Sequence, residues 1–369
     1  MRSIWELANP QLKNLKVYEP GKPIEETARE LQVDAHSIVK LASNENPLGP
    51  SPAAVAAMTD ALANAQLYPD GSAFYLIREI AARLKLGPDN IILGNGSNEV
   101  IEFAAHAFLN RGDSVVASQY AFIAYKIIAT LFDATVLEVP SPDYHQHLDS
   151  MLEAITPSTR LVFVPNPNNP TGTIVSQADI DRFMENVPDH VVTVFDEAYY
   201  EFLDRPPDTI RYVREERNVI VLRTFSKIHG LAGLRVGYGI APAAVIAILQ
   251  KTREPFNVNT VGQVGALAAL HDTKHQQRTK GTVDAGRKYF QAEFDRLRLE
   301  YLPGAGNFLM VKVGDGPAIF REMLRQKVIV RPLVGYGLGE WLRISIGTME
   351  QNQQCISALN HILTKTTAA

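Results

Sequence analysis

Four short segments of this 369-residue sequence carry polar side chains whose types and order indicate a reaction centre. They read NPNNPTG at 166–172, DEAY at 196–199, TFSK at 224–227 and GLRVGY at 233–238. The first three directly follow apolar, β-branched runs of strand length. Because open α/β sheets bind ligands at the carboxyl ends of their parallel strands, we expect these segments to converge on one site.

The side chains in these segments match the needs of pyridoxal 5′-phosphate (PLP). Lys227 offers the amine that bonds to the cofactor aldehyde, and Asp196 can keep the pyridine nitrogen protonated so that the ring accepts electrons. Tyr199 and Asn169 can donate to the phenolate oxygen. The phosphate needs hydroxyls and a guanidinium, which are those of Thr224, Ser226 and Arg235.

Each segment alone also has a structural explanation. A strand-end aspartate or a Ser-Lys pair is commonly structural, and every residue of 166–172 is a turn former. The ordered series of four segments is what favours cofactor binding. Other motifs fail: the glycine pattern at 94–96 has Glu99 at its third glycine position, and no P-loop, GxSxG or HExxH is present. His145 and His147 lack further ligands nearby, so we expect no metal.

The elements that must position this centre form an alternating pattern. Apolar runs without polar alternation are typical of strands covered on both faces, and they occur at 115–117, 161–164, 191–195 and 219–222. Helical patterns separate them. The alternation predicts an α/β domain with a mostly parallel sheet, which we place at 51–270.

The two ends of the chain read differently. Residues 271–369 combine a long helix at 276–298 with strand patterns near 308–311, 328–331 and 341–346, which predicts a smaller α+β domain. Residues 1–50 are punctuated by prolines and predict an arm that packs on other structure.

The composition argues against several classes of protein. Lysine and arginine total 36 against 40 acidic residues, so the net charge of −4 gives no basic excess for nucleic acid or an anionic membrane. No apolar run approaches the roughly 20 residues of a membrane helix, and the N-terminus lacks the apolar core of a signal peptide. The single cysteine, Cys355, cannot form an internal disulfide. We therefore expect a cytoplasmic protein.

Over nearly its whole length the sequence resembles the fold-type-I PLP-dependent aminotransferases, which share the four motifs above. Within that family the closest resemblance is to the histidinol-phosphate aminotransferases. It rests on YEPGKP at 18–23, LASNENP at 41–47, YPDG at 68–71 and WLRISIGT at 341–348. One departure is Ile228-His229, where many members have Ala-Phe or Ala-Tyr after the lysine.

The resemblance implies further parts of the site. Gly96, Ser97 and Asn98 would begin a helix whose N-terminal amides hold the cofactor phosphate. Tyr120 would stack on the pyridine ring. Tyr68 would reach the cofactor phosphate of a partner subunit, which implies an obligate homodimer with shared sites, with the 1–50 arm packing on the small domain or the dimer interface.

The resemblance also implies the substrates: histidinol phosphate and 2-oxoglutarate, converted to imidazole-acetol phosphate and glutamate in histidine biosynthesis. Arg343 and Arg331 stand in apolar strand patterns, where a charge needs an anion, supplied by substrate or by a protein carboxylate. Tyr18 and Asn307 are further substrate contacts. Three alternatives stay open: an aromatic amino acid aminotransferase, a threonine-phosphate decarboxylase, and a silent regulatory domain, against which the intact lysine, aspartate and arginines argue.

Overall fold

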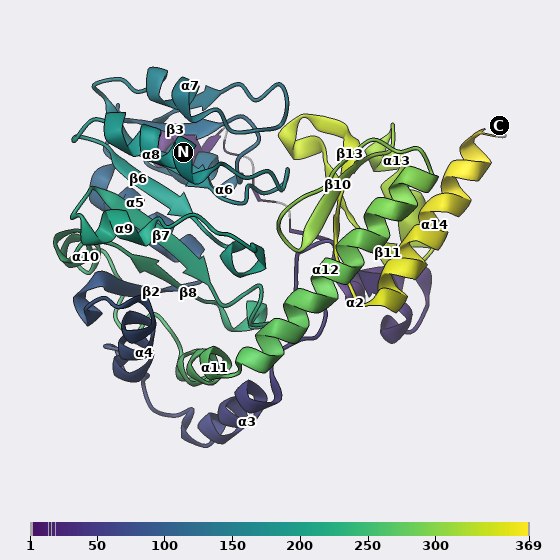
Figure 1. The fold of residues 1–369 in the computed structure, drawn as a ribbon, viewed down its shortest axis with the longest axis horizontal. Coiled ribbons are helices and arrows are strands. Elements are labelled where there is room, and N and C mark those ends of the chain that lie inside the picture. Colours follow the sequence, from purple (N-terminus) through teal and green to yellow (C-terminus); the bar gives the residue numbers. More distant parts are fainter. Residues whose placement is uncertain (1–2, 14, 16, 19, 368–369) are drawn as a thin grey trace.

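The computed structural model describes residues 3–13, 15, 17–18 and 20–367. Glu19 of the 18–23 segment and four residues of the predicted N-terminal arm, Met1, Arg2, Asn14 and Lys16, lie outside the described residues. Figure 1 shows two bodies side by side, a larger one built on a seven-stranded sheet and a smaller one built on a four-stranded sheet.

The seven-stranded sheet is mostly parallel, as the sequence predicts. Its strands, in chain order, are β2 (Ile91–Asn95), β3 (Ser114–Ser118), β4 (Thr135–Val139), β5 (Thr159–Pro165), β6 (Val192–Asp196), β7 (Val219–Thr224) and β8 (Val236–Ile240). Their spatial order is β2-β8-β7-β6-β5-β3-β4. Strands β4, β3, β5, β6 and β7 run parallel, and β8 is antiparallel to both of its neighbours. The parallel strands therefore share one carboxyl edge.

Helices cover both faces of this sheet, which explains why its strands lack polar alternation. On β5, Leu161 and Phe163 belong to one apolar cluster, whereas Val162 and Val164 belong to the other. The helices of this body are α3 (Pro52–Ala61), α4 (Phe74–Leu84), α5 (Ser97–Phe108), α6 (Ala124–Leu131), α7 (Leu148–Glu153), α8 (Gln177–Asn186), α9 (Ile210–Arg214), α10 (Ala243–Leu249) and α11 (Thr260–His271). Short 3₁₀ turns are η3 (Leu62–Asn64), η4 (Pro88–Asn90), η5 (Tyr200–Phe202) and η6 (Ala232–Leu234).

The smaller body is an antiparallel sheet packed against helices. Its strands are β9 (Tyr301–Leu302), β10 (Phe308–Lys312), β12 (Arg331–Leu333) and β13 (Leu338–Ser345), in the order β12-β13-β10-β9. The remaining elements are α12 (Thr273–Arg296), α13 (Gly316–Arg325), α14 (Met349–Thr367) and η7 (Val334–Tyr336). The predicted strand at 328–331 is divided, because β11 (Val328–Ile329) pairs with β1 (Val39–Lys40) in a separate sheet.

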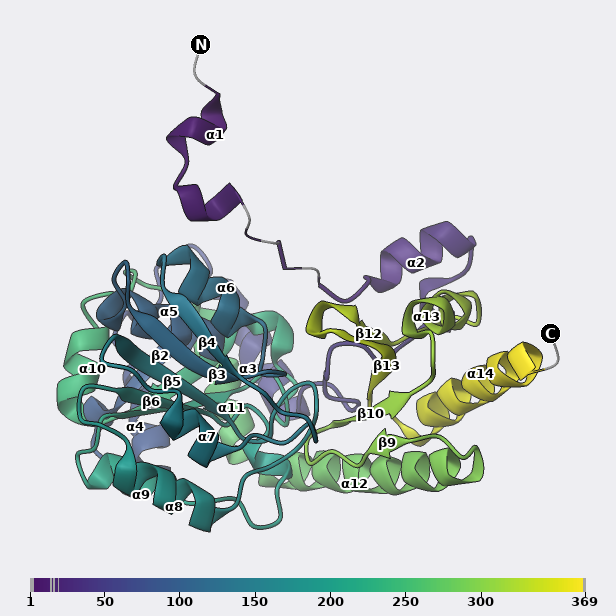
Figure 2. The same ribbon diagram turned by 90° about the horizontal axis from the view of Figure 1, so that it is seen from above.

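The N-terminal segment contains α1 (Ile4–Leu7), η1 (Pro10–Lys13), α2 (Ile24–Leu31) and η2 (Ala35–Ser37) before β1. From α2 onward it packs on the smaller body, where Ala28 and Ile38 share an apolar cluster with Ile329. Figure 2 shows α1 standing away from both bodies. No helix within the described ranges is long and apolar enough to cross a membrane. The domain limits at residues 50 and 270 stay a prediction.

Candidate active site

A cavity of about 280 Å³ lies at the carboxyl edge of the parallel sheet, where the smaller body and the N-terminal segment meet it. It brings together most of the site residues that the sequence predicts. Those that line it are Tyr18, Ser97, Asn98, Asn169, Asp196, Tyr199, Thr224, Ser226, Lys227, Arg235, Arg331 and Arg343.

Lys227 and Asp196 both enter this cavity from strand ends, Asp196 as the last residue of β6 and Lys227 three residues after β7. The Lys227 Nζ donates to the Ser43 carbonyl oxygen at 3.2 Å. Burial, with a contribution from Arg343, lowers the pKa of Lys227 to about 8, so much of this amine is uncharged in mildly alkaline solution. The neutral amine is the form that can act as nucleophile or base.

Asp196 is a buried carboxyl group with two hydrogen bonds. The Tyr125 hydroxyl donates to its Oδ2 at 2.6 Å, and the Ala198 backbone N–H donates to its Oδ1 at 3.2 Å. Burial raises the pKa of Asp196, while these donors and the charge of Lys227 oppose that rise. A further cation near this carboxylate would offset its desolvation, and a protonated pyridine nitrogen is such a cation.

Tyr199 keeps its proton and is held by a neighbouring amide. Burial raises its pKa to about 12, and the Asn44 Nδ2 donates to its hydroxyl at 2.9 Å. Asn44 is fixed in turn, because its backbone N–H donates to the Ser345 Oγ at 2.8 Å and Asn307 donates to its carbonyl oxygen at 3.0 Å. The phenol of Tyr199 is therefore a positioned donor beside Lys227, whose Nζ lies 5.6 Å from the ring centroid.

Hydroxyls and a guanidinium gather at one end of the cavity. The Thr224 hydroxyl donates to the Ser226 Oγ at 3.0 Å, and the Arg235 Nη1 approaches the same oxygen at 3.4 Å. No carboxylate forms an ion pair with Arg235 among the residues that the structure describes. This cluster offers hydrogen bonds and positive charge to an anion.

Two glycines allow the N-terminus of α5 to lie directly beside this cluster of hydroxyls and Arg235. A Cβ at Gly96, where φ is +74°, would lie 2.5 Å from the Arg235 Nη2, and a Cβ at Gly237 would lie 2.2 Å from the Ser97 nitrogen. Only glycine permits these approaches. The first amides of the twelve-residue helix α5 thus lie next to Arg235, with Ser97 and Asn98 on the cavity wall, an arrangement suited to a phosphate.

The opposite end of the cavity holds two arginines that are partners in register on β12 and β13, Arg331 and Arg343. Arg343 is buried and donates from Nη1 to the Asn169 Oδ1 at 2.6 Å and from Nη2 to the Ala42 carbonyl oxygen. Its Nε has no partner, and no carboxylate of the described chain pairs with it. Burial lowers the pKa of Arg343. The guanidinium of Arg331 lies 5.9 Å from the ring centroid of Tyr18.

Three predicted side chains lie away from this cavity. Tyr120 packs beside Tyr144, with ring centroids 5.7 Å apart, and Phe122 is the aromatic side chain that lines the cavity instead. The physical reason is a turn after β3, in which the Ala121 N–H donates to the Ser118 carbonyl oxygen and redirects the chain. Asn307 does not line the cavity, and its amide donates to the Asn44 carbonyl oxygen instead. Tyr68 does not line it either, and its side chain is 81% exposed.

Sequence reasoning did not single out several residues that the fold brings to this cavity. They are Ser43, Asn44, Glu45, Phe122 and Tyr125. The segment 41–47 was noted for its resemblance, yet nothing in its spacing links it to a lysine 180 residues later. Tyr125 lies in α6, and its contact with Asp196 depends on how that helix packs on β5.

The donor set fits PLP. An amine, a buried carboxylate and a phenol surround the centre of the cavity, and the Gly96–Arg235 cradle has the composition of a phosphate site. These groups come from separate strands and loops, and the fold assembles all of them around one space.

Comparison with known proteins agrees with this geometry. The family model "Aminotransferase class I and II" matches residues 36–359. A histidinol-phosphate aminotransferase of Akkermansia muciniphila is 53% identical over 362 residues, covering 98% of this chain and 100% of the relative. One of Moorella thermoacetica is 46% identical, covering 95% and 91%.

A solved structure supports the same assignment. The histidinol-phosphate aminotransferase of Sinorhizobium meliloti in complex with pyridoxal-5′-phosphate superposes with a TM-score of 0.87 at 25% identity, covering 97% of this chain and 98% of that one. The family model spans most of the chain, and the relatives align with nearly all of it. The chain therefore belongs to the class I and II aminotransferases, in the group of histidinol-phosphate aminotransferases, and its cofactor is PLP.

Proposed function

We propose that this chain transfers the amino group of histidinol phosphate to 2-oxoglutarate, which gives imidazole-acetol phosphate and glutamate, a step of histidine biosynthesis. The observation that carries the proposal is Arg343, a buried guanidinium with an unpartnered Nε beside the lysine site. A buried arginine without a carboxylate partner needs an anion, and each of these substrates brings one.

The charge of the cavity supports anionic substrates in general. Lys227, Arg235 and Arg343 line it, against the carboxylates of Asp196 and Glu45. Glu45 is already paired with Lys40, at 2.9 Å. The cavity therefore carries excess positive charge for a cofactor phosphate at the Arg235 end and a substrate anion at the Arg343 end. A planar guanidinium can bind either a carboxylate or a phosphate through two parallel hydrogen bonds.

The residues act in turn on an amino donor. When bound, PLP supplies the aldehyde that takes up the amino group and the ring that accepts electrons from the donor's α-carbon. Lys227 Nζ would act as the base that takes the proton from that α-carbon and as the acid that delivers it to the carbon supplied by the cofactor aldehyde. Asp196 would keep the ring nitrogen protonated, and Tyr199 and Asn169 would donate to the phenolate oxygen. Phe122, which lines the same cavity, would be the aromatic side chain that covers the ring.

We further propose a homodimer with shared sites, in which Tyr68 reaches the cofactor phosphate of the partner. Large apolar side chains stand exposed around Tyr68, an unusual feature unless another molecule covers them. They are Leu67, Phe74, Tyr75 and Phe256. The division into an arm at 1–50, a large domain at 51–270 and a small domain at 271–369, and a cytoplasmic location, belong to the same proposal.

The experiment that tests the substrate assignment compares three amino donors with one enzyme preparation. Histidinol phosphate, phenylalanine and phosphothreonine are each supplied with 2-oxoglutarate, and glutamate and carbon dioxide are both measured. The proposal expects the largest kcat/KM with histidinol phosphate and no carbon dioxide. A larger kcat/KM with phenylalanine would make the chain an aromatic aminotransferase, and carbon dioxide release from phosphothreonine would make it a lyase.

A further inference from the structure

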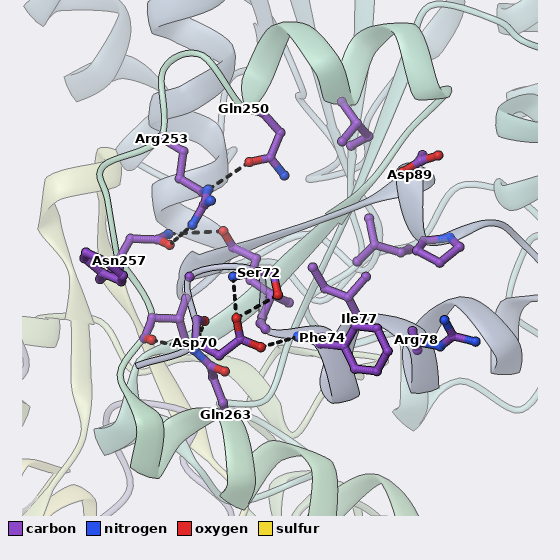
Figure 3. Close-up of a pocket in the computed structure, with 18 of the residues that line it drawn as sticks. Asp70, Ser72, Phe74, Ile77, Arg78, Asp89, Gln250, Arg253, Asn257 and Gln263 are labelled. Atoms are coloured by element: carbon purple, nitrogen blue, oxygen red, sulfur yellow. Dashed lines mark hydrogen bonds between the residues drawn. The ribbon is translucent and has the colours of Figure 1, made fainter. Parts of the chain in front are cut away.

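A second cavity, of about 690 Å³, lies between α4 and α10 and contains none of the four motif segments (Figure 3). Its rim includes part of the loop 250–259, which connects α10 to α11. Figure 3 shows Arg253 between Gln250 and Asn257, with hydrogen bonds to both, at 2.8 and 2.9 Å. Aminotransfer chemistry does not explain why the side chains of this surface loop form so many hydrogen bonds.

Asn257 is the centre of that bonding. Its Nδ2 donates to the Glu99 Oε2 at 2.7 Å and to the Leu93 carbonyl oxygen at 3.2 Å. Its backbone carbonyl accepts from the Asn95 Nδ2 at 2.8 Å. Glu99 also accepts from the Asn95 backbone N–H at 2.6 Å. The loop is therefore tied to the first turn of α5, whose amides form the phosphate cradle.

The neighbouring residue, Phe256, is held in a conformation that it would not adopt freely. Its φ is +56°, in the left-handed region that side-chain-bearing residues seldom occupy. Such residues persist where their surroundings fix them, and they cluster at functional sites. The four hydrogen bonds of Asn257 provide that fixation.

The ring of Phe256 therefore lies fixed against the ring of Tyr68, and we call it the aromatic platform. The two rings are stacked, with centroids 4.8 Å apart and an interplanar angle of 23°, although Phe256 is 47% exposed and Tyr68 is 81% exposed. Gly71 contacts the same ring, since a Cβ there would lie 3.4 Å from the Phe256 Cδ1. Gln263 joins the two loops, because its Nε2 donates to the carbonyl oxygens of Asp70 and Val258. The stacking on Phe256 thus restricts the orientation of the exposed Tyr68 side chain.

We propose that Phe256 is a positioning residue, whose ring, fixed through Asn257 and Glu99, orients Tyr68 so that its hydroxyl meets the cofactor phosphate of the partner subunit. The inference rests on the shared-site dimer proposed above. A preoriented phenol loses less side-chain freedom when it binds the phosphate than a freely rotating one. The platform should therefore increase retention of PLP without touching it.

The test measures the rate of PLP release from holoenzyme in Phe256→Leu, Tyr68→Phe and the double variant, with the oligomeric state checked by sedimentation. Leucine removes the ring and keeps the same kind of backbone constraint. Tyr68→Phe should speed release roughly tenfold or more, because it removes a hydrogen bond to a charged group. Phe256→Leu should speed release by about three- to tenfold. The double variant should match Tyr68→Phe alone, since the platform acts only through the tyrosine.

Two further variants separate positioning from general packing. Phe256→Tyr keeps the stacked ring and should retain the native release rate. Phe74→Leu removes another aromatic ring from this face, 49% exposed but not stacked on Tyr68, and should also retain the native rate when it is measured on protein that sedimentation shows to be dimeric. Unchanged release in Tyr68→Phe would overturn the shared site itself. Faster release in Tyr68→Phe together with native release in Phe256→Leu, or fully additive effects in the double variant, would overturn only the platform.

Discussion

Replacing Arg343 with lysine tests the substrate class, because it keeps the charge and removes the planar fork. Arg343 directs Nη1 to Asn169 and Nη2 to Ala42, and its Nε is unpartnered. The guanidinium is buried in β13, so a bound anion would meet it with little competing water. A lysine ammonium is a point charge and cannot make the two parallel hydrogen bonds that a guanidinium makes with a carboxylate or phosphate.

The expected magnitude follows from the loss of one hydrogen bond to a charged group. Such a bond contributes about 1.5–3 kcal/mol, so the affinity for substrate should fall by roughly one to two orders of magnitude. Both half-reactions should weaken, because in the proposed function histidinol phosphate and 2-oxoglutarate would use the same guanidinium in turn. The assay is single-turnover kinetics with each substrate, in which the dissociation constant is read from the concentration dependence. PLP content should stay native, because Arg235, at the other end of the cavity, is assigned to the cofactor phosphate.

Arg287→Lys provides a matched control. Arg287 also has an unpartnered Nε, but it is only partly buried, pairs with Asp284 at 2.9 Å and does not line the cavity. Its replacement should change stability and leave substrate affinity unaltered. The reasoning on Arg343 would be refuted if Arg343→Lys lost PLP or unfolded while its affinity per bound cofactor stayed native, since Arg343 would then be a structural residue.

Three further predictions concern the cofactor. Asp196→Asn should fold and bind PLP, but its activation free energy should rise by several kcal/mol, and each ~1.4 kcal/mol slows the reaction tenfold. Near-native steady-state turnover would contradict the role assigned to Asp196. Burial lowers the pKa of Lys227 from 10.5 to about 8, so the fraction of reactive, neutral amine increases as the pH rises through that value. The rate of PLP uptake by cofactor-free enzyme, followed by absorbance, should therefore increase up to about pH 8–9 and then stay constant. A rate that continues to increase to about pH 10 would show that Lys227 has the pKa of an ordinary lysine. Tyr68→Phe should weaken cofactor retention, and a fully active monomer in sedimentation at the assay concentration would disprove the shared site.

The sheet and the strand-end residues could be predicted from the sequence because both depend on local patterns. Runs such as 161–164 contain only apolar residues, and the structure divides them between two covered faces. Residues at or shortly after the carboxyl end of a parallel strand reach the same edge whatever the rest of the chain does, which is why Asp196 and Lys227 line one cavity.

Other parts of the site depend on packing that no local pattern encodes. Tyr120 and Phe122 are both aromatic residues after β3, and only the turn at Ser118–Ala121 decides which one faces the cavity. Asn44 reaches Tyr199, 155 residues away, because the N-terminal segment crosses to β13, where the Asn44 N–H donates to Ser345, 301 residues away in sequence. Asn307 has the polarity of a substrate contact, yet its amide supports Asn44 instead.

The most direct test of the central claim is reduction of the native enzyme with borohydride, followed by peptide mapping. The enzyme should absorb visible light before reduction, and the reduced cofactor should be found on the peptide that contains Lys227, with one label per chain. This result would place the cofactor aldehyde at Lys227, in the cavity that Asp196 and Arg235 also line. A label on another lysine, or no covalent label on enzyme that is active with histidinol phosphate, would contradict the account.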